Sequence, residues 1–228
     1  MYSNPNLPQV KGLAMPFARR YANEYVAPNR KVLIVPGALG STSIVYWDNK
    51  FTWSQKIDLY SDLKTRVQSA LQQPGSNRIV AILWHPGESD IQYLHFKATG
   101  IDPNTYIPGY TSRIPDIDAY GTILVELIER MRTDFGAAKC TPFLMGEPTS
   151  AWMQNDSQAV RLKDQLRAQL LSITEDVECV GFVSSSGLLS NIEQVRVESD
   201  VHFSAAALRE YGARYFEAFK TMLMESGI

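Results

Sequence analysis

The residues best suited to chemistry lie in three short stretches. The first is the turn Gly87-Glu88-Ser89-Asp90, which follows an apolar run and carries two carboxylates. The second is the loop Gly40-Ser41-Thr42, whose backbone N–H groups could hold an oxyanion. The third is Glu198–Ser204, in which His202 lies near Asp200, an arrangement suited to general acid–base catalysis.

Each stretch adjoins a predicted helix or strand. Short apolar runs predict buried strands at Lys31–Pro36, Arg78–Trp84, Thr141–Gly146 and Val177–Val183. Apolar residues at helical spacing predict helices at Leu13–Tyr25, Leu59–Gln73, Asp116–Phe135, Ser157–Ile173 and Ser204–Met224. Residues 91–115 are rich in proline and glycine and are predicted to form a long loop, a lid or rim.

The alternation of helix and strand predicts an α/β fold with a mainly parallel sheet and helices on both faces. Residues 1–228 contain no repeat and no evident linker, so we expect a single domain. Ligands of open parallel sheets bind at the carboxyl ends of the strands. The three stretches are therefore expected to meet at one edge of the sheet.

Composition excludes several classes of function. The 228 residues carry a net charge of −2 and no basic run, which argues against a nucleic-acid or anionic-membrane surface. We find neither a signal peptide nor a run long enough to span a membrane, and expect a soluble protein, cytoplasmic or virion-associated. Three well-separated histidines, His85, His95 and His202, offer no metal-ligand spacing, so we expect neither metal nor cofactor.

We interpret the remaining histidines and the two cysteines as structural residues. His85 and His95 are predicted to be packing or surface residues. Cys140 and Cys179 lie at the edges of predicted strands, and we favour two buried free thiols over a disulfide.

Several motifs together resemble a known family. Val35-Pro36, then Gly40-Ser41-Thr42-Ser43, then Trp84-His85-Pro86-Gly87-Glu88-Ser89-Asp90, and finally Asp200-Val201-His202-Phe203-Ser204-Ala205-Ala206 occur in its order and spacing. The family is the SGNH-hydrolase superfamily, in its branch of sialate O-acetylesterases and related carbohydrate esterases, with many bacterial and phage members. The resemblance covers roughly residues 12 to 220.

The resemblance implies a serine esterase in a flavodoxin-like three-layer α/β/α sandwich. It assigns His202 as the general base, with Asp200 beside it, and Glu88 as a support for the turn and the histidine. Gly40 would donate to the oxyanion, in a substrate loop completed by Ser41 and Gly87. The implied substrate is an O-acetylated carbohydrate, either sialic acid or a polysaccharide.

This chain departs from the family pattern at the nucleophile. The family places its serine in a Gly-Gln-Ser-Asn motif after a first strand, and neither the motif nor that strand is evident here. Ser3-Asn4 is the one serine-asparagine pair ahead of the first helix. Pro86 replaces a glutamine donor, a loss that could cost about 2.7–4 kcal/mol of transition-state stabilisation. Ser199 stands where the wider superfamily often has an aspartate.

Two interpretations follow from these departures. In one, the chain is part of a longer acetylesterase, or it pairs with another polypeptide that supplies the first strand and the nucleophile; Ser3 is the weaker candidate for a nucleophile within the chain. In the other, it is a degenerate relative, a pseudoenzyme with a structural or glycan-binding role, for example in a phage particle.

Overall fold

The computed structural model describes residues 12–40, 42–45, 58–85, 87–102, 114–195 and 200–225. Its sheet contains three strands, β1 (Ile82–Trp84), β2 (Phe143–Gly146) and β3 (Val180–Val183). They are parallel and lie in the order β1-β2-β3, with Trp84 opposite Met145 and Gly146 opposite Val183. The carboxyl ends of all three strands therefore form one edge of the sheet.

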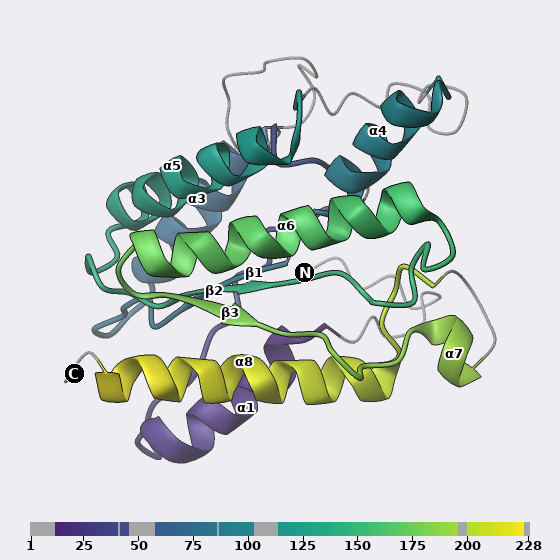
Figure 1. Cartoon of the computed structure of the whole chain (residues 1–228). Helices are drawn as coiled ribbons and strands as arrows, with labels where there is room; N and C mark the ends of the chain where they lie inside the picture. Colours follow the sequence, from purple (N-terminus) through teal and green to yellow (C-terminus); the bar gives the residue numbers. More distant parts are fainter. Residues whose placement is uncertain are drawn as a thin grey trace.

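Helices cover both faces of this sheet (Figure 1). The helices are α1 (Ala14–Tyr25), α3 (Leu59–Leu71), α4 (Glu88–Thr99), α5 (Ile117–Phe135), α6 (Ser157–Asp176), α7 (Asn191–Val195) and α8 (Ala205–Glu225). On one face α1 packs against α8, and α8 packs against β2 and β3. On the other face α6 lies on β3 and contacts α4 and α5, and α3 packs outside α5. This is the predicted three-layer α/β/α sandwich, and the fold class is confirmed.

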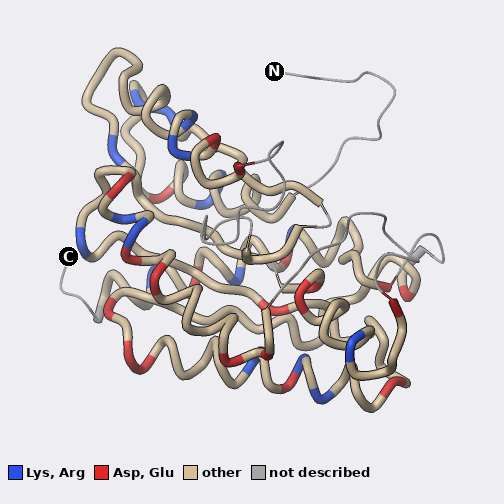
Figure 2. Tube along the Cα trace, turned by 90° about the horizontal axis from the view of Figure 1, so that it is seen from above, with Lys and Arg blue, Asp and Glu red and all other residues tan. Residues whose placement is uncertain are grey.

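Each face has its own hydrophobic core. Under α5 and α6 the core contains fully buried residues such as Leu127, Ile128 and Phe143. Under α8 it is largely aromatic, with Phe17 of α1 packed edge-on against Phe216 at a ring-centroid distance of 5.9 Å. Lys and Arg lie interspersed with Asp and Glu along the described trace (Figure 2).

Aspartates fix the beginning of three helices. The carboxylates of Asp58, Asp116 and Asp156 accept hydrogen bonds from backbone N–H groups in the first turns of α3, α5 and α6. Gly100 and Gly136 close α4 and α5 in the left-handed conformation that glycine adopts at low cost. The predicted helices at 13–25, 59–73, 116–135, 157–173 and 204–224 are thus confirmed within a few residues.

Two predictions of secondary structure are wrong. Residues 31–36 form no strand: among the described residues their backbone makes no ladder with β1, and Leu33 is 65% exposed. Val32 packs into one core and Val35 into the other, so the segment contributes to both cores without pairing with the sheet. Residues 91–99 of the predicted loop at 91–115 belong to the helix α4, and residues 103–113 lie outside the described part.

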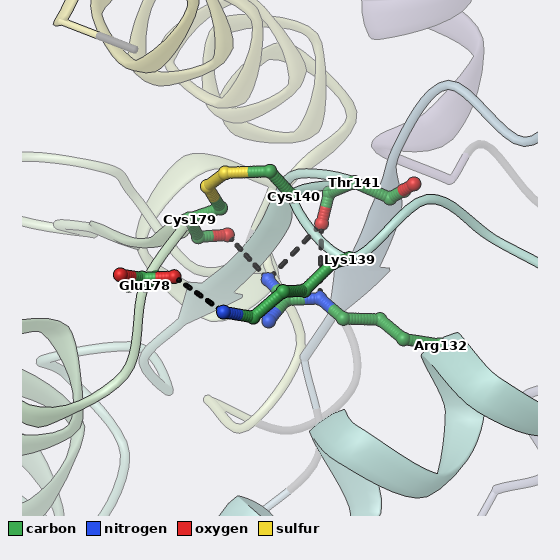
Figure 3. Close-up of a disulfide and its surroundings, with 6 residues drawn as sticks. All are labelled: Arg132, Lys139, Cys140, Thr141, Glu178 and Cys179. Carbon is green, nitrogen blue, oxygen red and sulfur yellow. Dashed lines mark hydrogen bonds and ion pairs between the residues drawn. A yellow bond between two sulfur atoms is a disulfide. The ribbon is translucent and has the colours of Figure 1, made fainter.

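The prediction of free thiols is also wrong, because Cys140 and Cys179 form a disulfide. Neither cysteine is fully buried. Their Cα atoms lie 5.2 Å apart, since the two residues precede the neighbouring strands β2 and β3 (Figure 3). None of the helices in the described ranges is long and apolar enough to cross a membrane.

Candidate active site

The turn after β1 depends on a glycine at position 87. Gly87 has φ +148°, a conformation that residues with a Cβ rarely adopt, and an added Cβ would lie 2.8 Å from Leu166 Cδ2 of α6. The backbone thus turns sharply against α6, and α4 begins immediately at Glu88. The structure therefore places Gly87 and Glu88 at the carboxyl edge of the sheet, as predicted from their position after the strand.

Asp90 joins this turn to the loop that contains Gly40. Its side chain is fully buried, and its Oδ2 accepts a hydrogen bond of 3.0 Å from the backbone N–H of Ile44. Ile44 and Val45 are themselves fully buried, whereas Gly40 is exposed. The buried end of the loop is thereby fixed to the turn, and its glycine faces solvent. Ser41 lies outside the described residues.

Replacing Asp90 with alanine is expected to destabilise the fold and to disturb this loop. The variant leaves the buried N–H of Ile44 without this acceptor, which costs about 1–3 kcal/mol. Urea unfolding followed by circular dichroism measures the change. Asp62→Ala is the matched control, because its carboxylate is 51% exposed in an ion pair with Arg66. Equal stability of the two variants would contradict the role given to Asp90.

Glu88 and His85 form a pair at the same edge. His85 Nε2 lies 3.5 Å from Glu88 Oε1, and the two side chains are 23% and 25% exposed. Burial lowers the pKa of His85 to about 4, so its imidazole is neutral at neutral pH. Burial, together with repulsion from Asp90, raises the pKa of Glu88 to about 7, against the opposing effect of its own backbone N–H.

Two tyrosines of α8 connect the ends of the three strands. The Tyr215 hydroxyl donates to the carbonyl oxygen of Trp84 at 2.9 Å. The Tyr211 hydroxyl accepts from the N–H of Glu147 at 2.7 Å and lies 3.1 Å from the carbonyl oxygen of Val183. Burial raises the pKa of both tyrosines, which keeps their hydroxyls protonated. Tyr211 and Tyr215, here called the floor of the candidate site, therefore form an uncharged and hydrogen-bonded layer beneath this edge of the sheet.

His202 reaches the edge from the loop before α8. Its backbone carbonyl accepts from Asn191 at 2.8 Å, and its side chain is exposed. The next residue, Phe203, is buried, with its ring centroid 5.6 Å from that of His85 and 5.0 Å from that of Tyr211. No residue within the described ranges hydrogen-bonds to the His202 ring, so its catalytic pairing stays a prediction.

Asp200 holds a neighbouring turn. Its Oδ2 accepts from the N–H of Met153 at 3.2 Å, and its carbonyl oxygen accepts from Thr149 Oγ1 at 2.6 Å. Met153 has φ +50°, a left-handed conformation that is costly for a side chain of this size. Asp200 therefore helps to hold a strained turn, and its predicted pairing with His202 stays untested. Glu198 and Ser199 lie outside the described residues.

His85 packs against Phe203 and Tyr211, in agreement with its prediction as a packing residue. Sequence reasoning missed one carboxylate at this edge. It is Glu147, directly after β2, which is 8% exposed. Its carboxylate accepts from the backbone N–H of Ser185 at 2.8 Å and pairs with Arg167 at 3.0 Å. The Gly-Glu-Pro sequence after β2 repeats the pattern of the turn after β1, and it could have drawn attention to Glu147.

The described residues contain no group of three or more His, Cys, Asp and Glu side chains placed to hold a metal ion. The structure places Gly87 and Glu88 at the carboxyl edge of the sheet, and Asp90 joins this turn to Ile44, four residues after Gly40. That Gly40 and His202 complete one active site with Glu88 stays a prediction.

Comparisons with known proteins agree with the motifs. Residues 4–99 match the model of a family described as carbohydrate esterase, sialic acid-specific acetylesterase. A crystal structure of NanS is similar to this chain with a TM-score of 0.63 and 19% sequence identity, over 94% of this chain and 72% of that one. A search of curated proteins found no match. The family match confirms the resemblance over residues 4–99, and the similar structure confirms the fold.

Proposed function

From the relationship of this chain to the sialic acid-specific acetylesterases, we propose that it hydrolyses O-acetyl esters of a carbohydrate such as sialic acid. The observation that carries the proposal is the hydrogen bond between Asp90 and the backbone of Ile44. It joins the turn after β1 to Ile44, the residue that follows the motif Gly40-Ser41-Thr42-Ser43, and so supports the two motifs acting together. The aromatic contact between His85 and Phe203 brings the segment of His202 to the same edge.

In the proposed reaction, each of the predicted site residues has a role. A hydroxyl attacks the acetyl carbonyl carbon while His202 accepts its proton, and the N–H groups of the Gly40 loop hold the resulting oxyanion. The intermediate then collapses, and the sugar hydroxyl leaves with the proton from His202. Water repeats the sequence on the acyl-enzyme and releases acetate. Asp200 and Glu88 would orient the histidine and the turn.

Two sources of the nucleophile stay open. One is Ser3, since the match to the family model begins at the next residue, Asn4, although both residues lie outside the described part. The other is a second polypeptide that supplies the first strand and the serine. Ser3→Ala separates the two, because it abolishes turnover in the first case and leaves it unchanged in the second.

Replacing His202 with alanine is expected to reduce the hydrolysis of p-nitrophenyl acetate and of O-acetylated sialic acid by at least about 100-fold, the smallest contribution typical of a general base. The measurement is the initial rate of acetate release. Arg209→Ala, at an exposed position of α8, is the control and should retain the parent rate. A His202→Ala variant as fast as the parent protein would disprove the assignment.

Pro86 favours one alternative, a degenerate esterase fold that binds an acetylated glycan without hydrolysing it. Proline provides neither an N–H nor a side-chain donor for an oxyanion. In that case calorimetry would detect binding of O-acetylated sialic acid, while no acetate would appear over many hours.

A further inference from the structure

The segment that carries His202 pairs with the end of the loop after β3. Ser190 and Phe203 lie opposite each other in an antiparallel bridge. One of its hydrogen bonds runs from the backbone N–H of Asn191 to the carbonyl oxygen of His202, at 2.8 Å. The other joins the N–H of Ser204 to the carbonyl oxygen of the residue before Ser190, at 2.9 Å. The backbone of His202 is therefore bonded directly to the start of α7.

A carboxylate in the first turn of α7 holds Ser190 in place. Ser190 is fully buried, and Oε2 of Glu193 accepts from its backbone N–H at 2.7 Å and from its hydroxyl at 2.9 Å. The N–H of Glu193 donates to Ser190 Oγ in return, at 3.4 Å. This reciprocal arrangement is a capping box, and hydrogen bonds to a carboxylate are stronger than those between neutral groups. Glu193 thus fixes the residue that lies opposite Phe203.

Other contacts hold the far ends of both segments independently of Glu193. Arg214 of α8 donates to the carbonyl oxygens of Ser184 and Ser186, at the start of the loop after β3. On the other segment, the carbonyl oxygen and the carboxylate of Asp200 accept hydrogen bonds from the turn after β2. Removing the carboxylate of Glu193 is therefore expected to loosen the bridge while the two segments remain attached to the fold.

We infer that Glu193 is a positioning residue for His202, and that it holds the imidazole in reach of the ester by fixing the bridge between Ser190 and Phe203. This inference rests on the proposed esterase function and deepens it. A general base must lie within hydrogen-bonding reach of the hydroxyl whose proton it accepts. A displacement of about 1 Å can cost about 100-fold in rate. Glu193 acts through the backbone, and no proton moves to or from it in the reaction.

The test measures kcat/KM with p-nitrophenyl acetate as the substrate. Glu193→Ala should lower kcat/KM by about 10- to 100-fold. Glu193→Gln should stay within about threefold of the parent protein, because its amide oxygen can accept the same hydrogen bonds from Ser190. In the His202→Ala background, Glu193→Ala should cause no further loss, since the base through which it acts is absent. Asp116→Ala is the matched control, because this carboxylate caps α5 through the N–H of Ala119 at 2.9 Å, and it should keep the parent rate.

Hydrogen exchange gives a readout that does not depend on activity. The amide protons of Asn191 and Ser204 form the bridge, so Glu193→Ala should speed their exchange by about tenfold or more. Glu193→Gln and Asp116→Ala should leave their exchange at the parent rate. Unchanged exchange of both amides in Glu193→Ala would show that the carboxylate does not hold the bridge, and would overturn the inference.

The outcomes separate the inference from the function. If Glu193→Ala hydrolyses the ester as fast as the parent, or if Glu193→Gln is as slow as Glu193→Ala, the inference is wrong and the esterase function stands. The same holds if Glu193→Ala slows the His202→Ala variant by the factor by which it slows the parent. If the folded parent protein releases no acetate, the function itself is wrong, and the positioning role fails with it.

Discussion

Replacing Gly146 with alanine is expected to destabilise the protein by about 3 kcal/mol or more, the upper range of overpacking effects. Gly146 is the last residue of β2, and the side chains of α8 and the turn after β1 close over it. An added Cβ would overlap the Tyr215 hydroxyl, and it would lie 2.5 Å from the Tyr211 hydroxyl and 2.9 Å from His85 Nδ1. Neither tyrosine hydroxyl can move away without breaking its hydrogen bond.

The cost arises because both hydroxyls are committed. Tyr215 donates to the carbonyl oxygen of Trp84, and Tyr211 accepts from the N–H of Glu147. Moving either ring would leave buried polar groups unpaired as well as disturb close packing. We therefore expect Gly146→Ala to lower both the melting temperature and the acetyl-ester hydrolysis.

The melting temperature measured by differential scanning calorimetry tests this expectation. A change of 3 kcal/mol in a chain of this size corresponds to a fall of roughly 6–12 °C. Gly12→Ala is the matched control, because nothing lies within 4 Å of its Cβ position. Adding Tyr215→Phe to Gly146→Ala removes the closest overlap and should restore part of the loss. A Gly146→Ala variant as stable as the control would show that the tyrosines do not close over β2.

Local signals predicted most of the helices. Leu59, Leu63, Val67 and Leu71 step by four, and the resulting helix α3 buries Leu59 and Val67. Asp116 and Gly136 mark the two ends of α5 by cap chemistry that depends on single residues. Such features can be predicted from the sequence, because the interactions that produce them lie within one or two helical turns.

The errors occurred where distant residues decide the structure. Lys31–Pro36 has the composition of a buried strand, but a strand also needs neighbours with which to exchange hydrogen bonds.

Helix α4 was missed because the prolines and glycines after residue 100 were assigned to one loop with it, although Glu88–Thr99 contains neither residue type. A single assignment for residues 91–115 overlooks Ile91, Leu94 and Phe96, whose side chains are buried on α4.

The candidate site shows the same division. The motifs predicted the edge of the sheet at which Gly87 and Glu88 lie, whereas the role of Gly40 stays a prediction. The sequence could not show that Asp90 bonds to Ile44 across 46 positions, or that Asp200 holds the turn at Met153. It also gave no sign that His85 lies against Phe203, because ring contacts between distant segments leave no local pattern.

Removing the disulfide is expected to cost about 4 kcal/mol, the loss of loop entropy for a sequence separation of 39 residues. Cys140 and Cys179 join the turns that lead into β2 and β3. Cys179 has φ +58°, an unfavourable left-handed conformation, and its carbonyl oxygen accepts from Arg132 at 2.7 Å (Figure 3). The bond and the guanidinium together hold this residue at the entrance of β3.

The variant Cys140→Ser/Cys179→Ser should melt roughly 8–16 °C below the parent protein. The parent treated with a reductant should show the same fall, since both changes remove the same cross-link. Lys139→Ala is the control, because its ion pair with Glu178 beside the disulfide is exposed and contributes little. Alkylation of the unfolded, unreduced parent should label neither cysteine. Two labelled thiols, or a double variant as stable as the parent, would contradict the disulfide, whereas the expected result indicates a protein that folds in oxidising surroundings.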